Sequence, residues 1–306
     1  MVVALSMLAP AHAAPPPDAE LMRTMLEGAE LHQTVTLQEA GSKPRRVVVF
    51  DPRPGAKASY RMESSQTMEM SVVGPDGNRM TIPGLDMAPV TGFTMYTEVG
   101  EPLAMGQVPV SVRYGEVSVT GVPAVMGEQM LASLKVLDGL GFRVLFDEGA
   151  IVQMDVSAKD QALYEGMQTL VDQYATNLPS FPSEAIGVGA VYTVDSRMKM
   201  AGMDLVSKQT ATVTELTDTS ITTSVVYTME LGDPNVQVPG LPPGAEMAFT
   251  SFEGAGKGTL TTDLTTMSYK GELTLDLTMD MKVDSLQLPG GSTQMGMSLS
   301  QKSVWK

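Results

Sequence analysis

The sequence has no cysteine and only two histidines among its 306 residues. Without cysteine the chain can form no disulfide, no thiolate metal site and no cysteine nucleophile. His12 belongs to the amino-terminal stretch, and His32 is expected on the polar side of a strand. No Ser-His-Asp arrangement, Gly-x-Ser-x-Gly elbow, phosphate-binding loop or dinucleotide fingerprint is recognisable. The sequence therefore predicts a protein that is not an enzyme, uses no cofactor and holds no metal.

Positive charge and long apolar runs are also scarce. The chain has 20 Lys and Arg residues against 35 Asp and Glu, which gives a net charge of −15. Such a balance argues against nucleic acid and against anionic membrane surfaces, because both attract basic patches. Beyond the first residues no run is long and apolar enough to span a bilayer as a helix. We expect no nucleic-acid partner and no transmembrane segment, and the sequence identifies no protein partner.

The amino-terminal residues have the composition of an export signal. Residues 1–13 are apolar and end in Ala11-His12-Ala13, the small-x-small pattern that signal peptidase cleaves. Residues 14–28, which contain three consecutive prolines, are expected to form an extended tether. A buried amino-terminal strand is the alternative interpretation. The signal interpretation predicts a soluble protein outside the cytoplasm, either periplasmic or secreted.

Alternation of apolar and polar residues predicts strands over most of the remaining chain. The clearest strand is Leu273–Val283, in which Leu, Met and Val alternate with Thr, Asp and Lys, so that one face is dry. The β-branched run Arg46–Phe50 is a further predicted strand, and Gly254–Gly258 is expected to form a loop. Residues 29–156 are interpreted as an N-terminal β half with one helix. Residues 183–306 are interpreted as a C-terminal β half rich in Thr and Met.

Two helices are predicted from apolar stripes at helical spacing. The first lies around Gly127–Gly139, with a stripe of Met and Leu that ends at glycine. The second starts near Ser157 and ends at Pro179 and Pro182, so that residues 157–182 form a central helix and a proline break. We therefore predict a mainly β protein of the α+β class. A large curved antiparallel sheet, or partial barrel, should carry the two short helices on its concave face.

Methionine is the unusual residue, with 25 copies against seven Phe and one Trp. Four Met-x-Met pairs occur: Met68/Met70, Met198/Met200, Met279/Met281 and Met295/Met297. One interpretation is an aromatic-poor core filled with flexible Met, and a second is an adaptable apolar cavity for acyl chains. A third is a thioether site for Cu(I), since soft metals select sulfur. The copper interpretation is weakened because no histidine or cysteine accompanies the pairs, and because they are spread along the chain.

One short segment carries a resemblance to known proteins. It reads Leu178-Pro179-Ser180-Phe181-Pro182 and, further on, Ile186-Gly187-Val188-Gly189-Ala190-Val191-Tyr192. It resembles an uncharacterised family of bacterial secreted proteins and lipoproteins, in which a Gly-x-Gly-acidic-x-Trp strand opens a Thr-rich β half. Ala190 replaces the acidic residue here and Tyr192 the Trp, and the family brings no established activity. The general layout is also similar to periplasmic lipoprotein carriers, whose curved antiparallel sheet wraps short helices.

These observations favour a non-enzymatic binding protein that holds a hydrophobic ligand, a lipid or an acyl chain, between sheet and helices. The side chains expected to line the site are Met68, Met70, Met167, Leu170, Tyr227, Met229, Leu277, Met279 and Met281. The alternative is a structural or interaction protein of the cell envelope with a fully packed core and no ligand. A cavity distinguishes the two, because a carrier needs an apolar void of roughly 300 Å³ or more.

Overall fold

The computed structural model describes residues 21–27, 33–73, 78–81, 88–158, 179–200, 203–233, 245–285 and 292–306. The protein is mainly β, as predicted. Its strands are β1 (Leu21–Glu27), β2 (Gln33–Glu39), β3 (Lys57–Val73), β4 (Arg79–Thr81), β5 (Val90–Val99), β6 (Val108–Thr120), β7 (Gly141–Asp147), β8 (Ala150–Ala158), β9 (Val191–Met200), β10 (Met203–Leu216), β11 (Ser220–Asp233), β12 (Ala245–Asp263), β13 (Tyr269–Ser285) and β14 (Ser292–Trp305).

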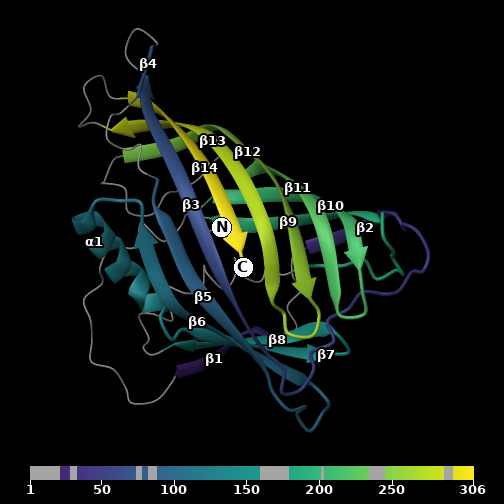
Figure 1. Ribbon diagram of the computed structural model, residues 1–306. Helices are drawn as coiled ribbons and strands as arrows, with labels where there is room; N and C mark the ends of the chain where they lie inside the picture. Colours follow the sequence, from purple (N-terminus) through teal and green to yellow (C-terminus); the bar gives the residue numbers. More distant parts are fainter. Residues whose placement is uncertain are drawn as a thin grey trace.

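All these strands belong to one large antiparallel sheet, which is twisted and curved (Figure 1). The order across the sheet is β1-β8-β7-β6-β5-β3-β14-β13-β12-β11-β10-β9-β2, and β4 pairs with β3 outside this path. From β9 to β14 the strands follow one another as neighbouring hairpins. The strand β1 was expected to be part of the tether, but it pairs with β8.

The sheet is not closed, because its end strands β1 and β2 do not pair with each other in the described part of the chain. They are nevertheless consecutive in the sequence. Since each residue advances the chain by at most about 3.6 Å, the link from Glu27 to Gln33 spans at most about 22 Å. The two ends of the sheet are therefore held close to each other, which requires the curvature.

The structure describes one α-helix, whereas the sequence predicts two. Helix α1 (Ala124–Leu134) continues as the 3-10 helix η2 (Lys135–Leu137) and ends before Gly139, whose φ of +79° suits glycine. Among the side chains of α1 only Leu134 is buried, and the helix packs mainly on β6. It therefore does not cover the sheet in the way the sequence predicts. Ser157 and Ala158 extend β8, and the rest of the predicted central helix, residues 159–178 with Met167 and Leu170, lies outside the described residues.

The predicted strand Leu273–Val283 is confirmed within β13, but the predicted loop Gly254–Gly258 is wrong. These residues lie in the middle of β12. A Cβ atom on Gly258 would come within 2.2 Å of the Glu272 carbonyl oxygen, and one on Gly254 within 2.7 Å of the Leu277 side chain. Glycine at alternate positions thus lets the side chains of β13 lean over β12, which explains glycine inside a strand.

Two apolar clusters occupy the inner face of the sheet, which is the face that carries Leu275, Leu277 and Met279. The basal cluster lies toward the β10–β11 and β12–β13 turns and combines Phe146 and Met154 from one end of the sheet with Tyr192 and Val194 from the other. The upper cluster consists of Leu205, Met229, Phe249, Phe252, Leu275, Leu277, Met279 and Leu299, with Met68, Leu231, Met281 and Met297 packed against it.

Residues 40–56 cross the basal end of the sheet. The predicted strand Arg46–Phe50 lies here, and it is wrong as a sheet strand: the segment is extended and makes a single bridge, from Arg46 to Ile186. Prolines on both sides of the run exclude longer pairing. Phe50 is buried in the basal cluster, and the Asp51 N–H donates to the Leu264 carbonyl at 2.9 Å. The segment therefore joins the basal cluster to the β12–β13 turn.

Candidate functional site

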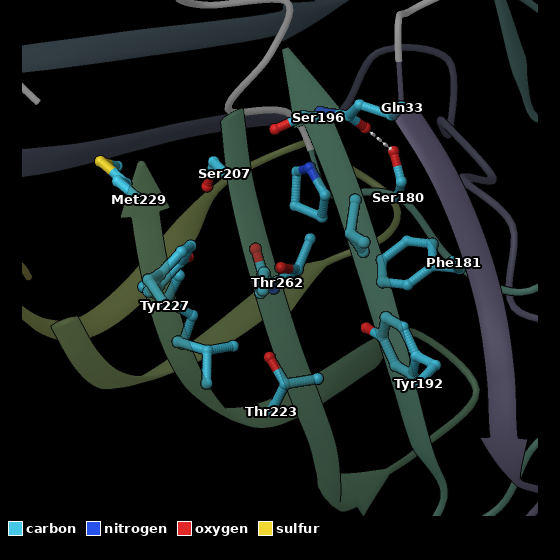
Figure 2. Close-up of a pocket in the computed structure, with 15 residues that line it drawn as sticks. Gln33, Ser180, Phe181, Tyr192, Ser196, Ser207, Thr223, Tyr227, Met229 and Thr262 are labelled. Atoms are coloured by element: carbon cyan, nitrogen blue, oxygen red, sulfur yellow. Dashed lines mark hydrogen bonds between the residues drawn. The ribbon is translucent and has the colours of Figure 1, made fainter. Parts of the chain in front are cut away.

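A small cavity of about 70 Å³ lies on the inner face between the two clusters. Strands β9, β10, β11 and β12 form its wall, Gln33 of β2 its edge, and residues 179–181 close it from the other side (Figure 2). Its lining includes Tyr192, Ser196, Ser207, Gln209, Thr223, Tyr227, Met229 and Thr262.

The segment that closes the cavity is held at two points. The Ser180 hydroxyl donates a hydrogen bond to the Gln33 side-chain oxygen, which joins the segment to the edge strand β2 (Figure 2). The Phe181 ring packs against Phe50, with 5.7 Å between ring centroids. Because Phe50 belongs to the basal cluster, this contact fixes the segment to the core of the protein.

The lining combines polar side chains with apolar ones such as Val194, Val225 and Leu260, and it carries no formal charge. Hydroxyl groups and the two amides of Gln33 and Gln209 supply its polar atoms, and no Asp, Glu, Lys, Arg or His of the described residues contributes to it. Burial raises the pKa of Tyr227 to about 12, and it raises the pKa of Tyr192 further. Both phenols therefore stay protonated at neutral pH. The lining can donate and accept hydrogen bonds, and it offers no group that titrates near pH 7.

The upper cluster adjoins this cavity through Met229, which belongs to both. Of the side chains predicted to line a site, Met68, Met229, Leu277, Met279 and Met281 come together in or against this cluster. Tyr227 lines the cavity and packs on the basal cluster. Met70 is half-buried on the same face, directly opposite Met297 of β14. The seven described members of the predicted set thus share one face.

The polar side chains of the cavity wall were not predicted from the sequence, although the sequence contains a signal for them. Thr223 lies between Ile221 and Val225 at a position where alternation along β11 places an inner-face residue. Ser207 and Gln209 continue the inner face of β10 in the same way. A hydroxyl or amide at an inward position within a dry face marks a polar site, because a buried polar group needs a partner.

A second group of buried polar side chains lies on β3 and β14, also between the two clusters. The Gln301 amide donates to the Ser64 hydroxyl at 2.9 Å and to the Ser303 hydroxyl at 3.0 Å, and all three residues are buried. The side-chain oxygen of Gln301 has no hydrogen-bond partner. Ladder register places Gln301 in one row with Leu275, Gly256, Tyr227 and Gln209. Polar side chains therefore lie between the two clusters on both sides of β13, whereas Leu275 makes the surface apolar on β13 itself.

Within the described ranges, no group of three or more His, Cys, Asp or Glu side chains is placed to hold a metal ion. The described residues also contain no helix that is long and apolar enough to cross a membrane.

Comparisons with known proteins do not assign the chain to a family. No protein-family model matches it, and no curated protein matches it. Among solved structures, it shows a likeness to an anion-selective porin from Comamonas acidovorans, at 11% identity and a TM-score of 0.16, over 81% of this chain and 99% of the porin. A second likeness is to OccAB4 from Acinetobacter baumannii, at 6% identity and a TM-score of 0.17, over 84% of this chain and 100% of the other. At these TM-scores neither likeness supports a conclusion about fold or function.

Proposed function

We propose that this is a non-enzymatic, extracytoplasmic binding protein that holds a hydrophobic ligand on the inner face of a sheet curved into a partial barrel. The observation that carries the proposal is the position of the uncharged cavity directly beside the upper cluster, with Met229 in both. The two surfaces together match an amphipathic ligand, with its polar head in the cavity and its chain along the cluster. The export-signal pattern of residues 1–13 supports a location outside the cytoplasm.

The upper cluster suits an acyl chain because its side chains are apolar and adaptable. Leu277, Met279 and Phe252 supply a continuous apolar surface, and each CH₂ group buried against it contributes about 0.8 kcal/mol. Methionine is unbranched and has three rotatable bonds, so it repacks around ligands of different shape. We therefore expect the affinity for an acyl chain to depend on the length of the acyl chain more than on its shape.

The cavity selects a neutral head group. Placing a carboxylate or phosphate among Gln209, Thr223 and Thr262 would bury a charge without a counter-ion, which costs several kcal/mol. An ester, amide or hydroxyl would exchange its bonds to water for bonds to these side chains at a much smaller cost. We therefore propose a neutral lipid or an acyl ester as the ligand class.

The cavity is small for a ligand site. Its size limits how a lipid can bind and favours a second candidate function. A volume of about 70 Å³ has room for about two water molecules at liquid density, well below the roughly 300 Å³ of a typical ligand site. The cavity can therefore hold a head group, and an acyl chain must displace side chains of the upper cluster. The second candidate is a structural or interaction protein of the envelope whose packed core holds no ligand.

Native mass spectrometry of the full chain, purified from an extracytoplasmic fraction without detergent, tests the proposal. A discrete added mass that organic extraction identifies as a neutral lipid supports it. We expect Met279→Asp to abolish this added mass, because the substitution places a charge within the upper cluster. The matched control is Thr274→Asp, which puts the same charge on the outer face of β13 opposite Lys257.

A third variant tests the head-group site. Thr223→Val keeps the shape of the side chain and removes its hydroxyl, so we expect it to weaken binding of an ester probe and to leave binding of a plain hydrocarbon unchanged. Retention of lipid by Met279→Asp would refute the lining assignment. A protein without added mass that also fails to bind a fluorescent acyl ester would support the packed structural protein instead.

A further inference from the structure

Strand register brings together three Met-x-Met pairs that are far apart in the sequence. They lie on three adjacent strands: Met68/Met70 on β3, Met295/Met297 on β14 and Met279/Met281 on β13. In the ladder, Met297 is directly opposite Met279 on one side and Met70 on the other. Met295 is directly opposite Met281 in the next row. Spread along the sequence, these pairs argued against a thioether metal site, and the register removes that objection.

The ladder register places Met70, Met297 and Met279 next to one another on three adjacent strands, as a set of ligands for one ion requires. Residues directly opposite in an antiparallel ladder point to the same face, with Cβ atoms about 4.5–5.5 Å apart. Met side chains are long and flexible enough to bring three sulfur atoms onto one ion from that spacing. Met279 is buried, whereas Met70 and Met297 are half-buried, so the row can be reached from solvent and is shielded at one end.

The chemistry of the row selects a soft ion. Thioether sulfur binds Cu(I), whereas Mg²⁺, Ca²⁺ and Mn²⁺ require oxygen ligands and Zn²⁺ prefers thiolate, imidazole or carboxylate. In the described part of the chain no His, Cys, Asp or Glu cluster competes for a metal. On the same face, the next row toward the basal end is Met68, Leu299 and Leu277, which keeps that side of the site apolar.

We propose that Met70, Met279 and Met297 form a binding site for one Cu(I) ion, with Met281 and Met295 in the neighbouring row as a second set of sulfur ligands. The site is distinct from the head-group cavity, which lies on β9 to β12 and contains none of these residues. The ion is bound without change of oxidation state, so the site holds or passes on copper and carries out no redox step.

The test is a titration of the purified full chain with Cu(I) under anaerobic, reducing conditions, in competition with a colorimetric Cu(I) chelator. We expect one equivalent of Cu(I) per chain, and X-ray absorption with only sulfur neighbours around the metal. Ag(I), which has similar ligand preferences and does not change oxidation state under these conditions, should compete for the same equivalent.

Substitution of methionine by leucine separates sulfur chemistry from packing, since leucine retains the apolar volume. We expect Met297→Leu to weaken Cu(I) binding at least tenfold. Met95→Leu, at a buried methionine of the basal cluster, should leave it unchanged. If Met297→Leu fails to fold, Met70→Leu at the half-buried end of the row provides the same comparison. Absence of stoichiometric binding, or binding that neither variant changes, would overturn the proposal.

The same variants keep the two proposals separate. Met297→Leu should retain a lipid, because the surface stays apolar, and should lose copper. Thr223→Val should weaken binding of an acyl ester and retain copper. Binding of copper without lipid would support the copper proposal and refute the lipid proposal. Binding of lipid without copper would do the reverse.

Discussion

Alkaline pH should unfold this protein through its buried tyrosines. Five of its eight tyrosines, Tyr60, Tyr114, Tyr192, Tyr227 and Tyr269, are buried or half-buried in or against the basal cluster. In each case burial raises the pKa above 10, most simply because a phenolate would lose its hydration. The folded state then binds more protons than the unfolded state above pH 10, so the free energy of unfolding falls as pH rises.

The size of this loss follows from the pKa difference. For Tyr227, whose pKa is raised from 10 to about 12, it reaches at most about 3 kcal/mol. At pH 11, which is about one unit above the pKa of an unfolded tyrosine, each buried tyrosine lowers the free energy of unfolding by on the order of 1 kcal/mol. The five tyrosines together therefore lower it by several kcal/mol. Because domains are stable by about 5–15 kcal/mol in total, unfolding should occur between about pH 11 and 12.

Absorbance at 295 nm and far-UV circular dichroism, recorded together between pH 9 and 12.5, measure this directly. We expect the buried tyrosines to ionise in one steep step that coincides with loss of the β-sheet signal. Tyr227→Phe removes one of the groups and should move the midpoint to higher pH. Ionisation of all tyrosines near pH 10 with an intact β-sheet signal would refute the reasoning.

Further predictions concern stability, measured by urea unfolding. Gly258→Ala should lower the free energy of unfolding by about 1–3 kcal/mol, because its Cβ would approach the Glu272 carbonyl oxygen and force two strands apart; an unchanged midpoint would contradict this. Gly127→Ala, inside α1 with ordinary contacts around its Cβ, should instead raise it by about 0.5–1 kcal/mol. Asp155→Ala should cost about 2–3 kcal/mol, because Asp155 is buried and pairs with the Arg143 guanidinium at 2.5 Å. A cost below about 0.5 kcal/mol would contradict this prediction, because it would mean that water replaces Asp155 as the partner of the partly exposed Arg143 guanidinium without a cost in stability.

Local alternation was enough to predict the strands that have one wet and one dry face. In β13, Leu275, Leu277 and Met279 are buried while Asp276 is exposed, as the sequence Leu273–Val283 predicts. Such a pattern depends only on the period of the strand and on which face meets the core. The predicted seven inner-face residues therefore lie on one side of the sheet.

Features that depend on a neighbouring strand were not predictable in this way. Gly254–Gly258 resembles a flexible loop in one dimension, and its place inside β12 is explained only by the approach of β13. The run Arg46–Phe50 has strong β propensity, yet it lies between Pro44 and Pro52, makes a single bridge and crosses the basal end instead of joining the sheet. In both cases tertiary contacts override the local preference.

Register is the property that most changes the interpretation of the methionines. The pairs of β3 and β14 are more than two hundred residues apart in the sequence. Only the pairing of the strands makes Met70, Met297 and Met279 neighbours. A shift of one residue in either ladder would send one partner to the outer face. The sequence can therefore show that a chain has sulfur ligands on dry faces, while the structure is needed to show that they meet.

The net charge of the chain is also a poor predictor of what the inner face can bind. The ion pairs Arg79–Asp280 and Lys302–Glu272 lie on the outer face, where each contributes at most about 1 kcal/mol. The inner-face cavity is lined by uncharged groups alone. The net charge of −15 therefore describes the surface that meets solvent and other macromolecules, and it does not determine the ligand. An acidic outer face and an uncharged inner-face cavity are thus separated by a single layer of strands, so the net charge gives no argument against the uncharged lipid or the soft metal ion proposed for the inner face.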